Sequence, residues 1–106
     1  MTDADRMLIR RRAERCEEEC VLITHGSDSM VATAMALQGI PDKRIVLTGA
    51  LQPAIFAQTD AIFNIGCALG AVQSKPPGVY IAMNGEVFDA HKVVKNVKAN
   101  RFEHVA

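Results

Sequence analysis

Two short polar loops hold most of the residues in this 106-residue chain that could do chemistry. The first loop, Thr24-His25-Gly26-Ser27-Asp28-Ser29, follows an apolar run, and so does the second, Thr48-Gly49-Ala50. Hydroxyls, one carboxylate and the amides that open a following helix suit a small polar ligand. Serine and aspartate also cap helices, so on local pattern alone capping is the favoured role of Ser27, Asp28 and Ser29.

The elements that must position these loops follow from the hydrophobic pattern. Residues 21–24, 45–48 and 79–83 are short apolar runs, which predict strands that are buried on both faces. Thr2 and Asp5 form a capping-box pattern at the start of an amphipathic helix over residues 3–19. The apolar face of this helix is expected to hold Leu8, Ile9, Ala13, Cys16 and Cys20.

Two further helices are expected between the strands. The first covers residues 30–38, where nearly every residue is a good helix former, and ends before Gly39. The second follows an irregular stretch over residues 50–59, and Thr59 and Asp60 are its candidate caps. Its buried stripe is expected at Ile62, Ile65, Leu69 and Val72, with Gly66 and Gly70 allowing a close approach to the sheet.

Helices alternating with strands predict an α/β fold with one domain over residues 1–106. The predicted class is a three-layer parallel sheet, Rossmann-like or flavodoxin-like, with a terminal hairpin at Asn84-Gly85. The chain opens on a helix, so the first strand of such a unit is expected to be missing. An uncovered sheet edge and an alanine-rich helix predict a homodimer or larger assembly. Residues 91–106 are predicted to form loop and short helix.

Composition excludes several functions. Twelve basic and twelve acidic residues give a net charge of zero, which argues against binding nucleic acid or an anionic membrane. Cys16, Cys20 and Cys67 lack the spacing of a zinc site or disulfide framework, and reduced thiols favour the cytoplasm. No apolar run is long enough to cross a membrane. No G-x-G-x-x-G follows a predicted strand, which argues against a dinucleotide site.

Several motifs, in order and correctly spaced over residues 20–95, resemble the bacterial-type L-asparaginase family. His25-Gly26-Ser27-Asp28-Ser29-Met30 is similar to the family's H-G-T-D-T-M signature, and Val46-Leu47-Thr48-Gly49-Ala50 is similar to its second loop. Asp60 with Phe63-Asn64 resembles the family's next helix, and residues 78–85 with Val87-Phe88-Asp89 resemble its later strand and hairpin. By position after the hairpin, Lys95 corresponds to the family's catalytic lysine.

The resemblance implies hydrolysis of the side-chain amide of L-asparagine, and also of L-glutamine, to the acid and ammonia, without metal or organic cofactor. It implies that Ser27, Asp28 and Lys95 are catalytic and that Gly26, Ser27, Asp28 and Ala50 bind substrate. An ammonium that is taken out of water gives up its proton more easily, so a lysine beside a hydroxyl can act as its base. Asp28 would bind the substrate's α-ammonium, and His25 would brace the loop.

The chain also departs from the family. Family members carry their first nucleophile in a T-G-G-T-I type segment, and no threonine here is followed by two glycines. The only tyrosine, Tyr80, lies in a predicted strand, and Gln52-Pro53 replaces the usual R-P pair. The chain is therefore expected to be weakly active or inactive alone. The alternative is a non-catalytic α/β binding or assembly module that self-associates through the uncovered sheet edge.

Overall fold

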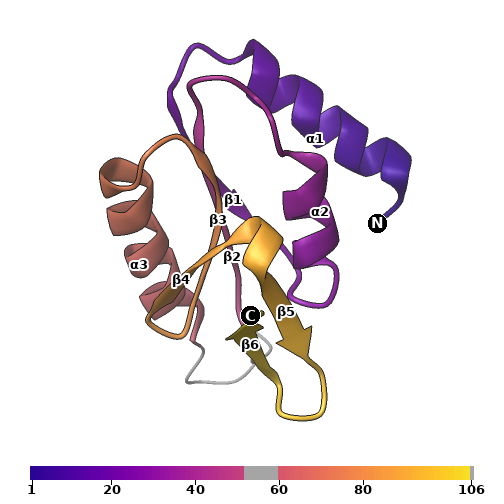
Figure 1. Ribbon diagram of the computed structural model, residues 1–106, viewed down its shortest axis with the longest axis vertical. Coiled ribbons are helices and arrows are strands. Elements are labelled where there is room, and N and C mark those ends of the chain that lie inside the picture. The colour runs from indigo at the N-terminus through magenta and orange to yellow at the C-terminus, as the bar shows by residue number, and fades with distance from the viewer. Residues whose placement is uncertain (52–59, 106) are drawn as a thin grey trace.

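The computed structural model describes residues 1–51 and 60–105, in which helices and strands alternate as far as the third strand (Figure 1). In chain order the elements are α1 (Asp3–Arg15), β1 (Cys20–Thr24), α2 (Met30–Ala36), β2 (Arg44–Thr48), α3 (Ala61–Ser74), β3 (Gly78–Met83), β4 (Glu86–Asp89), the 3-10 turn η1 (Ala90–Lys92), β5 (Val93–Asn96) and β6 (Arg101–His104). The irregular residues expected at Gln52-Pro53 and the candidate cap Thr59 lie outside the described residues.

The main sheet has the strand order β1-β2-β3-β4, which leaves β1 at one edge. β1 pairs parallel to β2 and β2 pairs parallel to β3, as the three apolar runs predicted. β4 returns antiparallel to β3 through the Asn84-Gly85 turn, where both residues have the positive φ of a tight hairpin. Since Thr24 lies opposite Thr48, the loops that follow β1 and β2 leave the sheet side by side, at the carboxyl ends of the two strands.

The fold has three layers, and α1 and α2 lie on the opposite side of the sheet from α3 (Figure 1). Alternate strand residues supply the two cores because successive side chains point to opposite faces. Ile45, Leu47 and Ile81 pack in the core beneath α2, while Val46 and Tyr80 pack beneath α3. This arrangement confirms the predicted α/β class. None of the helices within the described ranges is long and apolar enough to cross a membrane.

α1 begins at its predicted cap, since the Thr2 side chain accepts from the Asp5 amide and the Asp5 side chain accepts from the Thr2 amide. The expected helix is too long, because α1 ends at Arg15 and Cys16 already has an extended backbone. Cys20 belongs instead to β1, where it pairs with Arg44. Of the predicted apolar face, Ala13 is buried and Leu8 is exposed.

The predicted buried stripe of α3 is wrong. Val72 is buried, but the other three members, Ile62, Ile65 and Leu69, are exposed. The face that meets the sheet is built from small or polar side chains instead, namely Asn64, Ala68 and Ala71. Small side chains let the helix lie close to the strands, and periodicity could not choose a face on a helix that is apolar nearly all round.

Gly66 and Gly70 also differ from expectation, because a Cβ at either position would meet no atom of the described residues within 4 Å. Both glycines therefore lie on the outer side of α3 rather than against the sheet. The prediction for residues 91–106 is wrong in part. η1 is a short helical turn, but most of the segment forms the antiparallel β5–β6 hairpin, a separate two-stranded sheet.

Candidate active site

Lys95, from β5, reaches the loop that follows β1. Its Nζ lies 2.9 Å from Ser27 Oγ and 2.5 Å from Asp28 Oδ1. The Lys95 side chain is only 10% exposed, whereas the Asp28 side chain is 88% exposed. The ammonium thus joins a hydroxyl and a carboxylate while its stem is covered, and the carboxylate remains open to solvent.

The β5–β6 hairpin places Lys95 because it is anchored in the core. Val93 and Phe102 are buried on this hairpin, and the ring centroid of Phe102 lies 6.5 Å from that of Phe88 on β4. A hydrogen bond from Arg101, and then one from Asn96, lower the pKa of the Glu103 carboxyl. The bond from Asn96 on β5 to Glu103 on β6 also ties the two strands together. Lys95 therefore stands on a braced strand.

His25 braces the first loop from within. Its Nε2 lies 2.8 Å from Oγ1 of the fully buried Thr33 on α2, and its Nδ1 lies 2.7 Å from the Gly26 carbonyl. Arg6 on α1 donates to the same Thr33 hydroxyl at 3.2 Å. These contacts agree with the bracing role expected for His25.

The two loops touch through Gly49. The His25 amide donates to the Thr48 carbonyl at 2.9 Å. A Cβ at Gly49 would stand 2.2 Å from the His25 carbonyl oxygen, so only glycine allows the backbones to come this close. Beside it, the buried Thr48 hydroxyl donates to the Ala82 carbonyl on β3 at 2.7 Å.

Asn64 and Asp60 hold the second loop, a role that their sequence pattern did not predict. The fully buried Asn64 donates to the Gly49 carbonyl at 2.8 Å and accepts from the Asn84 amide at 2.9 Å. Asp60 accepts from the Leu51 amide, at 3.1 Å for Oδ1 and 3.0 Å for Oδ2. A single amide side chain on the otherwise apolar side of a helix is the signal that could have revealed this clamp, because buried polar groups need partners.

The structure therefore brings together Ser27, Asp28 and Lys95, with Gly26 beside them in the chain. Ala50 follows Gly49 in the adjoining loop and is not a partner in the hydrogen bonds that Lys95 makes to Ser27 and Asp28. Ser29 is the N-cap residue of α2, but its side chain makes no capping bond. The contacts of Ser27 and Asp28 with Lys95 go beyond what capping alone explains.

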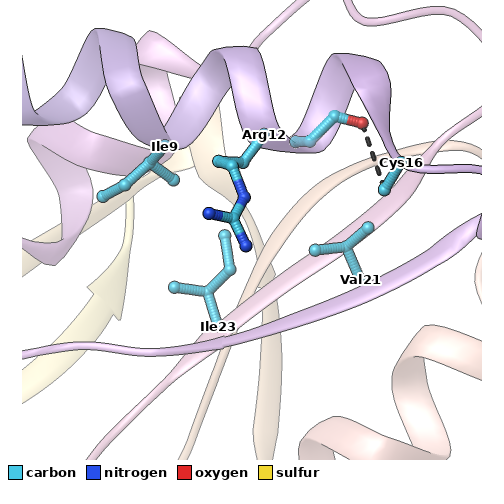
Figure 2. A pocket seen from close by; sticks show the side chains of 6 residues that line it. Ile9, Arg12, Cys16, Val21 and Ile23 are labelled. Atoms are coloured by element: carbon cyan, nitrogen blue, oxygen red, sulfur yellow. Dashed lines mark hydrogen bonds between the residues drawn. The ribbon is translucent and has the colours of Figure 1, made fainter.

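The described ranges contain no group of three side chains suited to hold a metal ion. A cavity of about 230 Å³ lies between α1 and β1, lined by Ile9, Arg12, Ala13, Cys16, Val21 and Ile23 (Figure 2). Its lining is mostly apolar, and Arg12 extends from α1 into it. It shares no residue with the Lys95 cluster, so it is not the substrate site that the chemistry indicates.

Comparison with known proteins assigns the family. The family model described as "Asparaginase, N-terminal" matches residues 1–105. The glutaminase-asparaginase of Acinetobacter glutaminasificans is 34% identical over 91 residues, covering 81% of this chain and 28% of that protein. A glutamyl-tRNA(Gln) amidotransferase component from Methanococcus vannielii is 38% identical over 73 residues, covering 67% of this chain and 17% of that protein.

A solved structure agrees with this assignment. The probable cytoplasmic L-asparaginase from Campylobacter jejuni superposes with a TM-score of 0.82 at 31% identity, covering 90% of this chain and 33% of that one. This chain belongs to the asparaginase family. It spans about a third or less of the length of each of these relatives.

Proposed function

We propose that this chain is an amidohydrolase of the asparaginase type, which acts on the side-chain amide of L-asparagine and also on that of L-glutamine. The contact of Lys95 Nζ with both Ser27 Oγ and Asp28 Oδ1 carries this proposal. Membership of the asparaginase family supports the reaction class. Its relatives include proteins named for asparagine and for glutamine, and both are side-chain amides.

The proposed roles follow from the positions of the groups. Lys95 is proposed to take the proton of a hydroxyl nucleophile as that oxygen bonds to the amide carbon. The proton then passes to the leaving nitrogen, which departs as ammonia, and water releases the acid from the resulting ester. Asp28 is exposed enough to accept hydrogen bonds from the substrate's α-ammonium. The Gly26 and Ala50 backbones would line the remaining sides.

Ser27 is proposed to act with Lys95 as the second half of the catalytic apparatus. The 106 residues contain no T-G-G-T-I run that would supply the first nucleophile. Groups that act as a unit lose most of their effect when one is removed. The purified 106-residue chain should therefore hydrolyse asparagine near the background rate.

The decisive experiment measures ammonia release from L-asparagine by the chain with and without an added amino-terminal T-G-G-T-I segment. Addition should raise the rate, and Lys95→Met should return it to background. If the unmodified chain is already fast and Ser27→Ala abolishes its activity, Ser27 is the nucleophile and the division of roles is wrong. If Lys95→Met leaves the rate of ammonia release unchanged, the proposal itself is contradicted.

The second candidate is a non-catalytic binding or assembly module. It is favoured by the position of β1 at the sheet edge, where residues 21–23 stay partly exposed. An assembled chain that neither binds nor hydrolyses asparagine, with or without the added segment, would favour this candidate.

We also propose a cytoplasmic location, which the name of the Campylobacter relative supports and cell fractionation tests.

A further inference from the structure

The outer face of α3 is the largest apolar feature that the proposed function leaves unused. Ile62 is 81% exposed, Phe63 62%, Leu69 52% and Ile65 39%. α3 carries no Asp, Glu, Lys or Arg along its 14 residues. It lies alone on its side of the sheet in Figure 1, and within the described ranges no other element covers its outer face. A helix that is apolar all round is normally buried on all sides.

The same face contains both projections and hollows. Gly66 and Gly70 lie one turn apart on it, and a Cβ at either would meet open space. Large side chains stand beside them at Ile62 and Leu69. Paired small residues at this spacing let two helix backbones approach closely, with the neighbouring large side chains packing around the contact.

We propose that this face binds the same face of a second copy of the chain, with the two α3 helices antiparallel about a two-fold axis beside Gly66. The register follows from the spacing. Gly66 then meets its own copy, and Ile62 of each chain lies opposite Gly70 of the other. One surface thus supplies both the projection and the hollow, as an isologous interface requires.

Area and charge favour this occupant. The four exposed side chains leave on the order of 500 Å² of apolar surface per chain, so a pair buries about 1,000 Å², near the lower limit for a specific interface. An uncharged face offers nothing to a charged peptide, whereas a second copy matches its character. The contact is distinct from the β1 edge and does not depend on the proposed catalysis.

Sedimentation equilibrium of the 106-residue chain over a concentration series tests the surface. The wild-type chain should dimerise in the micromolar range, and Leu69→Glu should raise the dimer Kd by about tenfold or more. Val97→Glu is the matched control, because Val97 is 75% exposed in the turn between β5 and β6 and should leave Kd unchanged. A monomeric wild type, or a dimer insensitive to Leu69→Glu, overturns the proposal.

Gly66→Leu distinguishes close packing of the two helices from non-specific hydrophobic association. Leucine suits a helix, and a Cβ at Gly66 would meet no described atom within 4 Å, so the monomer should stay folded by circular dichroism. It blocks the approach of the two backbones, so Kd should rise by about tenfold or more. Tighter association in this variant would mean that the face is only adhesive, and would overturn the two-fold packing.

Cross-linking tests the register and does not depend on those variants. Under mild oxidation Gly66→Cys should form a disulfide across the axis, identified by peptide mass spectrometry. Gly70→Cys should not, because the two copies of residue 70 stand about 12 Å apart along the helices, too far for a disulfide. Equal cross-linking at both positions, or none at either, overturns the antiparallel arrangement.

Discussion

The loops that follow β1 and β2 lie against each other at the carboxyl ends of these strands, but they are held in different ways. In the first loop, Ser27 and Asp28 bond to Lys95, which comes from a hairpin 67 or more residues away in the chain. In the second loop, the backbone at Gly49 is fixed by the buried Asn64.

The difference separates groups available for chemistry from groups that support them. In the second loop the Thr48 hydroxyl, the Gly49 carbonyl and the Leu51 amide each have a partner inside the protein, so losing one partner leaves the other group without its hydrogen bond. Asp28 is 88% exposed, so its carboxylate stays accessible to a ligand while it holds Lys95. The second loop therefore resembles a scaffold, and the first resembles a site.

The sharpest test of this comparison replaces one glycine in each loop. Gly49→Ala places a Cβ 2.2 Å from the His25 carbonyl, so the loops must separate, and we expect a loss of about 2–4 kcal/mol in unfolding free energy. The Cβ of Gly26→Ala would meet nothing within 4 Å among residues 1–51 and 60–105, so this variant should change stability by less than about 1 kcal/mol. Urea unfolding measures both, and equal losses would erase the distinction between the loops.

Asn64→Leu should have the next largest effect. It removes the hydrogen bonds to the Gly49 carbonyl and from the Asn84 amide, so we expect a loss of about 2–3 kcal/mol. Ser27→Ala in the first loop is the control and should cost less than about 1 kcal/mol. Thermal and urea unfolding of both variants would decide, and a neutral Asn64→Leu would show that the clamp is dispensable.

Lys95→Met should affect asparagine binding more than stability. Methionine keeps an apolar stem of similar length, and an ion pair to an exposed carboxylate contributes little, so stability should change by less than about 1 kcal/mol. Asparagine binding should nevertheless fall by about tenfold or more if Lys95 orders Ser27 and Asp28. Calorimetric titration checks the binding, and an unfolded Lys95→Met variant would instead assign Lys95 a structural role.

Acid should act weakly on the hairpin that carries Lys95. Hydrogen bonds from Arg101 and then Asn96 hold the pKa of Glu103 below its usual range in the folded chain. The stabilisation of the folded chain by ionised Glu103 is therefore complete above the pKa that Glu103 has in the unfolded chain. It is lost as pH falls through the lower pKa that Glu103 has in the folded chain. The melting temperature of Glu103→Gln should fall less steeply with acid than that of wild type; parallel curves would contradict this.

The sequence predicted the parts of the fold that depend on local signals. The capping box of Thr2 and Asp5, the three parallel strands and the Asn84-Gly85 hairpin are all present. The resemblance to the asparaginase family, through the position of Lys95 after the hairpin, predicted that Lys95 would approach Ser27 and Asp28, and the distances agree.

The errors arose where tertiary packing decides. α3 is apolar on nearly every side, so its periodicity pointed to Ile62 and Leu69 while the structure buries Asn64 and Ala68. The burial of Asn64 could not be predicted from its local sequence, because its hydrogen-bond partners at residues 49 and 84 come from distant segments. In the part of the chain that the structure describes, β5 and β6 pair only with each other. Their local signals are weak, which explains why the sequence favours a loop there.

The loop after β1 and Lys95 are proposed to form a site for an amide substrate. The most direct measurement is an amide NMR titration of the ¹⁵N-labelled chain with L-asparagine. We expect saturable shifts at Gly26, Ser27, Asp28 and Ala50 that disappear in Asp28→Ala. No shifts in this region, or shifts that persist unchanged in Asp28→Ala, would contradict it.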